Sequence, residues 1–485
     1  MLTSTANGND SRHSFWRRVR EYAVPPSMIE TATARRLAGD WAGACAAANV
    51  EVDFRLRDVA RRHGRELADR VRADLRCLAP DLLRWHLPRS APDGLLRPGL
   101  TMALARYPGE RLVHLVVRTP PGWAEYGQRI ALALWDGSGG DGRSLHPRPR
   151  PSRRFRYDLH RHLWDAGRSG ELAERAGSGA PTSRPDTGVG DPVHAAVGDL
   201  VSDLFRAPVG DPGERHAVDR WAAEADLLRQ ADGRPDGPVV VRLGRRRRLL
   251  LGPDGSTTDA TGDTTGLPLL PDAATWVPPD LDLLRRGAIE PDRLHPLVAA
   301  ALAPGHPSRT PTRTPTRTGP SAGPAPERLV DCRGEWHRIG LVDGVLAPLD
   351  HDPAQLRREE LLAALSGSPL PCLVAVDVAH RRPNELAGVR DRLDHGDTAG
   401  ALAVVEHLLG PEAVLRDGPL RDELAAAAQR RIAYGLYRTG LVRSGLTYPI
   451  DHRSPTYRTP PSDAAYRPRP RHSSFRAHPR LATRS

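Results

Sequence analysis

The segment at residues 308–318 limits the possible folds more than any other, because it repeats Arg-Thr-Pro-Thr and continues into Gly-Pro-Ser-Ala-Gly-Pro-Ala-Pro. A run this rich in proline and polar residues cannot bury a hydrophobic core and favours an extended linker. We therefore predict a Thr/Pro/Arg linker over residues 304–327. It separates the N-terminal two thirds of the chain from a C-terminal α+β domain at residues 328–439.

The positive charge follows the same division of the chain. All 70 basic residues are arginine, and the formal net charge is +11. Three segments carry +6, +3 and +7 of formal charge, so the remainder is mildly acidic; they are residues 143–161, 308–318 and 440–485. Because these basic segments are rich in proline, the charge does not indicate a folded DNA-binding face. We predict that residues 440–485 form a disordered basic tail.

The absence of lysine excludes several enzyme classes. It removes the P-loop NTPases, protein kinases, pyridoxal enzymes and Ser-x-x-Lys enzymes, each of which needs a lysine at its centre. Arginine without lysine, together with abundant alanine, is the codon bias of a GC-rich genome, such as an actinobacterial one. The N-terminus lacks the apolar run of a signal peptide, and the apolar stretch at residues 297–303 is too short to span a bilayer. We therefore expect a cytoplasmic protein with no membrane partner.

Apolar periodicity and turn residues predict an α+β, multidomain chain. It is mainly helical, with short antiparallel hairpins and proline-rich linkers. The predicted regions before the linker are a flexible N-terminus (1–24), a helical hairpin plus β-hairpin region (25–136), a basic low-complexity loop (137–155) and a helical region with a β-hairpin (156–303).

Individual elements follow from caps, stripes and turns. Helices are predicted at 27–38 (from a capping box at Ser27), 67–78, 192–206, 212–230, 353–366, 386–393 and 420–440. Strand pairs are predicted at 112–117 with 130–135 and at 239–241 with 249–251. A meander is predicted at 329–332, 335–342 and 345–348, followed by a fully buried strand at 373–378.

Two segments share a helix, Gly-Asp, helix pattern. They contain Gly39, Asp40, Trp41 and Ala44 in the first, and Gly396, Asp397 and Ala401 in the second. Glycine closes one helix in the left-handed conformation, and aspartate caps the next. The pattern resembles the Gly-Asp-Tyr-x-x-Ala turn of tetratricopeptide-type helical hairpins, although Thr398 departs from it and no 34-residue period joins the two segments. The resemblance implies a protein-binding groove.

Two other patterns match known binding motifs, but the residues around them argue against a binding site. The run of glycines at residues 137–142 matches the dinucleotide fingerprint, but the prolines at 147, 149 and 151 prevent the helix that the fingerprint requires. His160 and His162 lie near Asp158 and Asp165, yet residues two apart on a helix point in different directions. We expect solvated histidines there rather than a metal site.

The C-terminal domain holds the only grouping that suggests chemistry. Cys332 and His337 fall on the predicted meander, while Asp350, His351, Cys372, Asp377 and His380 fall near predicted strand ends. These residues form a Cys/His nucleophile pair or a metal site if the fold brings them together. The alternative is that both cysteines are small buried hydrophobes and Asp377 a satisfied core carboxylate. From sequence alone we assign no catalytic residue, metal or cofactor.

The tail interleaves aromatic residues with arginine. Arg467, Arg469, Arg471, Tyr457 and Tyr466 are its candidate contacts with single-stranded nucleic acid or with an acidic protein. Three hypotheses follow. The first is a non-enzymatic interaction or scaffold protein with an unknown protein partner. The second is a nucleic-acid-associated protein that binds through the tail and the arginine-rich loop. The third is an enzyme that uses the C-terminal Cys/His/Asp set.

Overall fold

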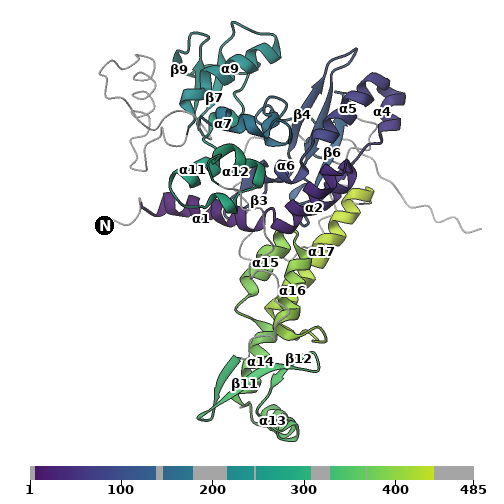
Figure 1. The fold of residues 1–485 in the computed structure, drawn as a ribbon, viewed down its shortest axis with the longest axis vertical. Helices are drawn as coiled ribbons and strands as arrows, with labels where there is room; N and C mark the ends of the chain where they lie inside the picture. Colours follow the sequence, from purple (N-terminus) through teal and green to yellow (C-terminus); the bar gives the residue numbers. More distant parts are fainter. Residues whose placement is uncertain are drawn as a thin grey trace, which may run out of the picture. The chain divides into compact units, whose positions relative to one another are not determined.

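A computed structural model describes residues 6–137, 146–177, 216–244, 247–306, 328–367 and 369–441. Helices dominate and the strands form several small sheets, which confirms the predicted α+β class (Figure 1). Among the described residues, no helix is both long and apolar enough to cross a membrane. The predicted helix at 192–206 and the tail residues Arg467, Arg469, Arg471, Tyr457 and Tyr466 lie outside the described residues.

The N-terminal region is built around a four-stranded sheet of order β1-β6-β5-β4. β5 and β6 pair antiparallel as predicted, with Val117 opposite Leu132, whereas β1 joins β6 in parallel. The strands are almost wholly buried, because helices supply apolar side chains such as Leu75 and Leu83 to the same core. The elements are α1 (Ala6–Tyr22), α2 (Pro26–Leu37), α3 (Trp41–Ala47), β1 (Val50–Val52), α4 (Leu56–His63), α5 (Arg65–Cys77), α6 (Pro80–His86), β2 (Arg89–Ser90), β3 (Leu95–Leu96), β4 (Thr101–Tyr107), β5 (Val113–Arg118), η1 (Gly122–Ala124) and β6 (Ile130–Trp135).

The middle region adds a second small sheet and short helices. The predicted hairpin is present, with Val241 opposite Leu249, and a third strand extends it. The predicted helix at 212–230 is observed as α9 (Val218–Asp232). The other elements are η2 (Arg161–Leu163), η3 (Ser169–Glu171), α7 (Leu172–Arg175), β7 (Val239–Arg242), β8 (Arg248–Leu251), β9 (Thr257–Asp259), α10 (Asp272–Thr275), α11 (Pro279–Arg285), η5 (Pro291–Arg293) and α12 (Pro296–Leu302).

The C-terminal region begins with the predicted meander. Arg333 and Gly334 have φ of 62° and 91°, and Asp343 and Gly344 have φ of 51° and 77°. Two consecutive residues of positive φ make the type I′ turn that joins two-residue hairpins, so both turns follow from the sequence. The elements are β10 (Arg328–Cys332), β11 (Glu335–Val342), β12 (Val345–Pro348), α13 (Pro353–Ser366), α14 (Pro371–Arg381), α15 (Leu386–His395), α16 (Thr398–Leu409) and α17 (Pro419–Thr439).

The strand predicted at residues 373–378 is wrong, because this segment lies within the helix α14. A short apolar run has no periodicity that separates a buried strand from a buried helix. Pro371 occupies the first turn of α14, a position where its missing N–H costs nothing. The correction matters because it places Cys372 in the first turn of a helix.

Both Gly-Asp segments form the expected turns between helices. Gly39 and Gly396 have φ of 77° and 87°, and Asp40 and Asp397 accept hydrogen bonds from the N–H groups of Gly43 and Gly400 at 2.8 and 2.9 Å. These contacts cap α3 and α16. The capping box predicted at Ser27 is wrong, because α2 starts at Pro26, with Pro25 as its N-cap and no side-chain cap.

Arg84 links the C-terminal helices to the N-terminal sheet region. Its guanidinium is fully buried and donates to the backbone carbonyl oxygens of Ala23, Gly127, Gln128 and His395. The turn at Gly396 packs against the loop that contains Gly127 and Gln128, since a Cβ at Gly396 would stand 2.2 Å from the Gly127 oxygen. The α15–α16 turn is therefore fixed by contacts from residues more than 250 positions away in sequence.

Candidate metal centre

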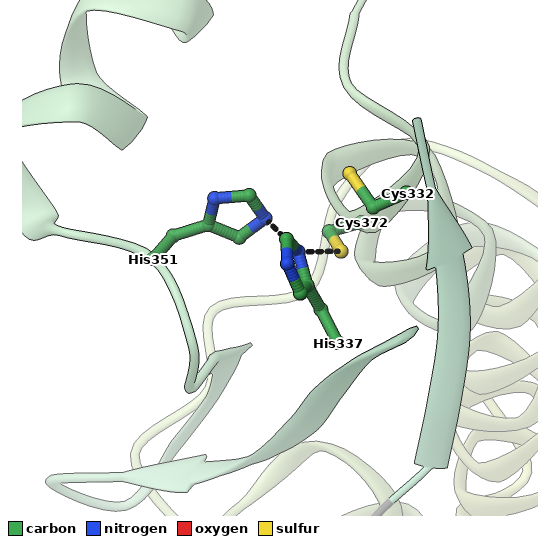
Figure 2. Close-up of side chains that lie close together, drawn as sticks. All are labelled: Cys332, His337, His351 and Cys372. Carbon is green, nitrogen blue, oxygen red and sulfur yellow. Dashed lines mark hydrogen bonds between the residues drawn. The ribbon is translucent and has the colours of Figure 1, made fainter. Parts of the chain in front are cut away.

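Four side chains with metal-ligating atoms converge in the C-terminal region. One donor atom from each of Cys332, His337, His351 and Cys372 lies within 4.8 Å of the other three. Figure 2 shows His337 on its strand between His351 and Cys372, with Cys332 at the end of the neighbouring strand. The four residues come from β10, β11, the loop after β12 and the first turn of α14.

The hairpin register brings Cys332 and His337 together. Cys332 pairs with Glu335, and Val330 pairs with His337. Because side chains alternate between faces along a strand, these four residues share one face of the sheet. Cys332 and His337 are diagonal neighbours on that face, a separation that long side chains can bridge.

A backbone clamp holds His351 beside the sheet. The Arg338 carbonyl accepts from the N–H of Leu349 at 2.8 Å, and the Arg338 N–H donates to the Asp350 carboxylate at 2.7 Å. The Arg338 guanidinium donates to the same carboxylate at 2.7 Å. The chain after β12 is thus tied to β11, and the His351 Nε2 reaches 2.8 Å from the His337 Nδ1.

Cys372 lies in the first turn of α14, in an apolar environment. Cys372 is fully buried and packs with Cys332 and Leu370. Burial raises the pKa of the Cys372 thiol to about 12, and the facing Cys332 thiol contributes to the rise. A metal cation between the two sulfurs reverses this preference, because coordination deprotonates a thiol.

The spacing of the donor atoms suits a tetrahedral ion. Zinc binds histidine nitrogen at about 2.0–2.1 Å and cysteine sulfur at about 2.3 Å, which places its ligand atoms roughly 3.3–3.8 Å apart. The His337 Nδ1 lies 2.8 Å from the His351 Nε2 and 4.0 Å from the Cys372 sulfur. Shifts of about half an ångström therefore bring these two distances to tetrahedral values.

The protonation state of His351 and the carboxylate beside His337 are also typical of histidines that bind a metal. Burial and the neighbouring His337 lower the pKa of His351, which favours the neutral imidazole that ligates metal. The other ring nitrogen of His337, Nε2, lies 3.5 Å from the Glu335 carboxylate. A carboxylate behind a ligating histidine is a common way to orient the ring in metal sites.

The remaining candidates of the C-terminal set lie outside this cluster. Asp377 is paired with Arg381 and Arg416, each at 2.8 Å. His380 is buried on α14, and burial lowers its pKa. The structure therefore brings Cys332, His337 and His351 together with Cys372, and it leaves Asp377 and His380 apart from them. Asp350 acts on the cluster only through the clamp on His351.

The expectation of solvated histidines at residues 160 and 162 is wrong. Both rings are buried, and they meet edge to face with centroids 5.7 Å apart. The His160 Nε2 lies 3.3 Å from the Glu224 carboxylate, which Arg175 also pairs. Instead of the helix expected here, this segment forms a single 3-10 turn, Arg161–Leu163, so the helical separation of the two rings does not apply.

Comparisons with protein-family models, curated proteins and solved structures found no match to the chain. The Cys2His2 geometry therefore provides the main evidence on function. Sequence reasoning named all four residues without establishing that they meet. The alternation in β10 and β11 was the one available indication, since it already places Cys332 and His337 on the same face.

Proposed function

We propose that the chain is a zinc-binding interaction protein, in which Cys332, His337, His351 and Cys372 hold one structural Zn²⁺. The observation that carries the proposal is the convergence of two sulfurs and two imidazole nitrogens within 4.8 Å. Soft thiolates combined with imidazoles select zinc among the common divalent ions. Four protein ligands fill a tetrahedral shell, whereas a catalytic zinc keeps one position for water or substrate. A structural role is therefore favoured over the enzyme hypothesis.

The zinc would add to contacts that already join these parts of the C-terminal region, such as the buried packing of Ile339 against Val376 and the clamp on His351. Its ligands come from a hairpin, from the loop after β12 and from a helix, so one ion would cross-link all three. The apolar core around the ligands is small, and among the described residues it holds three buried ones, Cys332, Leu370 and Cys372. Metal binding contributes directly to folding in small domains of this kind.

The opposite face of the hairpin supports an interaction role. Trp336 and Leu329 alternate with the ligand residues and point away from them, and they are 68% and 61% exposed. Exposed aromatic side chains on a rigid sheet are typical anchors of protein interfaces. We propose that the metal orders this sheet and that Trp336 contacts a protein partner, in a chain that we still expect to be cytoplasmic.

Native mass spectrometry of the full chain, prepared with zinc supplied, tests the metal. We expect one zinc per chain, complete loss in Cys372→Ser and full retention in the control Cys77→Ser, whose thiol is exposed and lies outside the cluster. A metal-free parent, or zinc retained by Cys372→Ser, would contradict the proposal.

A second experiment separates the interaction from the metal. Proteins that co-purify at native abundance are compared between the parent and Trp336→Ser. We expect the variant to keep its zinc and to lose a stoichiometric partner. An unchanged set of partners would remove Trp336 from the interface.

A further inference from the structure

A polar cavity of about 600 Å³ lies where α17 meets the ends of β1, β5 and β6. Its walls include Phe54, Arg55, Arg118, Arg129, Tyr437 and Arg438, together with the carboxylates of Asp53 and Asp58. These residues lie in the N-terminal sheet region and on α17, and none is a ligand of the proposed zinc. The volume falls within the range that holds small-molecule ligands, about 300–1,000 Å³.

Most of the charges around this cavity neutralise one another. Arg438 pairs with Asp53 and, at 2.7 Å, with Glu51. Arg129 also pairs with Glu51, at 3.3 Å. Asp58, the other carboxylate of the wall, pairs with Arg61. The acidic side chains at the cavity are therefore already engaged by arginines.

Two arginines of the lining have no such carboxylate. Among the residues that the structure describes, neither Arg55 nor Arg118 forms an ion pair, and the buried Nε of Arg118 has no hydrogen-bond partner. Arg118 is half-buried, whereas Arg55 is exposed. A half-buried guanidinium whose Nε has no hydrogen-bond partner costs free energy, because it has lost part of its hydration. Such a group in a cavity is the arrangement expected of a site that receives its partner from a ligand.

The aromatic residues of the cavity wall indicate what the rest of the ligand is. Tyr437 is held in place by edge-on packing against Trp123, with centroids 5.5 Å apart. Phe54 adds a second aromatic surface to the cavity wall. Aromatic side chains beside arginines suit a flat ring that carries an anionic group.

We propose that this cavity binds a phosphorylated small molecule of mononucleotide size. Arg118 and Arg55 contact the phosphate, and the aromatic wall contacts the ring. Two unpaired cations match the charge of a phosphate monoester, and the guanidinium fork matches its oxygen geometry. A monocarboxylate would leave one of the two cations without a partner.

Isothermal titration of the full chain with adenosine monophosphate and with inorganic phosphate tests the site. We expect both to bind the parent, with adenosine monophosphate binding more tightly. Arg118→Met should weaken adenosine monophosphate binding by about tenfold to hundredfold, the usual effect of losing hydrogen bonds to a charged group. The control Arg62→Met alters an exposed arginine of α4 that does not line the cavity, and it should bind like the parent.

Melting temperature distinguishes a ligand-binding arginine from a structural one. Without ligand, Arg118→Met should melt no lower than the parent, because it removes a half-buried guanidinium that forms no ion pair and whose Nε has no hydrogen-bond partner. A parent that binds neither probe, or an Arg118→Met variant with parental affinity or a clearly lower melting temperature, would overturn the site. Zinc content measured on the same samples keeps this outcome separate from that of the metal proposal.

Discussion

Replacing Arg84 with methionine should strongly destabilise the chain. The Arg84 guanidinium has no carboxylate partner among the described residues and is held by four carbonyl oxygens, with donor–acceptor distances of 3.1 Å to Ala23, 3.3 Å to Gly127 and 3.0 Å to His395. The fourth acceptor is Gln128. Burial lowers the pKa of Arg84 to about 10, so the group remains charged at neutral pH.

The size of the effect follows from these contacts. Hydrogen bonds from a charged donor contribute about 1.5–3 kcal/mol each, so four of them exceed the several kcal/mol that burying the ion costs. Arg84→Met removes all four donors and leaves buried carbonyls without partners. We expect the free energy of unfolding to fall by about 3–5 kcal/mol, the usual range for breaking a buried charged network.

Urea denaturation followed by tryptophan fluorescence measures this loss. Arg84→Lys should recover part of the stability, because an ammonium group keeps the charge but reaches fewer acceptors. The control Arg76→Met alters an exposed arginine and should stay within about 0.5 kcal/mol of the parent. A loss below about 1 kcal/mol for Arg84→Met would refute the role assigned to these four contacts.

Two further predictions concern the α15–α16 turn that Arg84 holds. Burial lowers the pKa of His395 to about 4, whereas the unfolded chain takes up the proton near its ordinary value of 6.5. Stability should therefore fall as the pH drops from about 6.5 to 4, and His395 should contribute up to about 3 kcal/mol of that fall. Because the pKa values of other buried histidines, such as His162, are also lowered, His395→Gln should reduce the loss in urea titrations across that range rather than abolish it. An equally steep acid loss in the variant would contradict the assignment. Gly396→Ala should lower the free energy of unfolding by about 3 kcal/mol, because its φ is positive and its Cβ would stand 2.2 Å from the Gly127 oxygen. The control Gly39→Ala has a similar φ but open space around its Cβ, and should lower it by only about 1–2 kcal/mol. Equal melting temperatures for the two variants would show that the close approach of Gly396 to Gly127 does not affect stability.

Local rules in the sequence were enough to predict much of the C-terminal region. Arg333-Gly334 and Asp343-Gly344 define the two tight turns, and the meander follows from them. The Asp352 cap and Pro353 likewise define the start of α13. The strand prediction for residues 373–378 is wrong because an apolar run has no periodicity that separates a strand from a helix. Pro371, just before this run, is the residue that favours a helix start.

The metal cluster was only partly predictable for a different reason. Strand alternation places Cys332 and His337 on one face, which is a local property. The positions of His351 and Cys372 depend on the Asp350–Arg338 clamp and on the packing of α14, and both are tertiary contacts. The buried pair of His160 and His162 was misjudged for the same reason, since Glu224 comes from a distant helix.

X-ray absorption at the zinc edge of the full chain tests the central claim most directly. We expect a four-coordinate shell with two sulfurs at about 2.3 Å and two nitrogens at about 2.0–2.1 Å, supplied by Cys332, Cys372, His337 and His351. Replacing His351 with alanine should reduce the nitrogen count by one or abolish binding. A shell of only nitrogen and oxygen, or a shell that both Cys372→Ser and His351→Ala leave unchanged, would contradict the Cys2His2 centre.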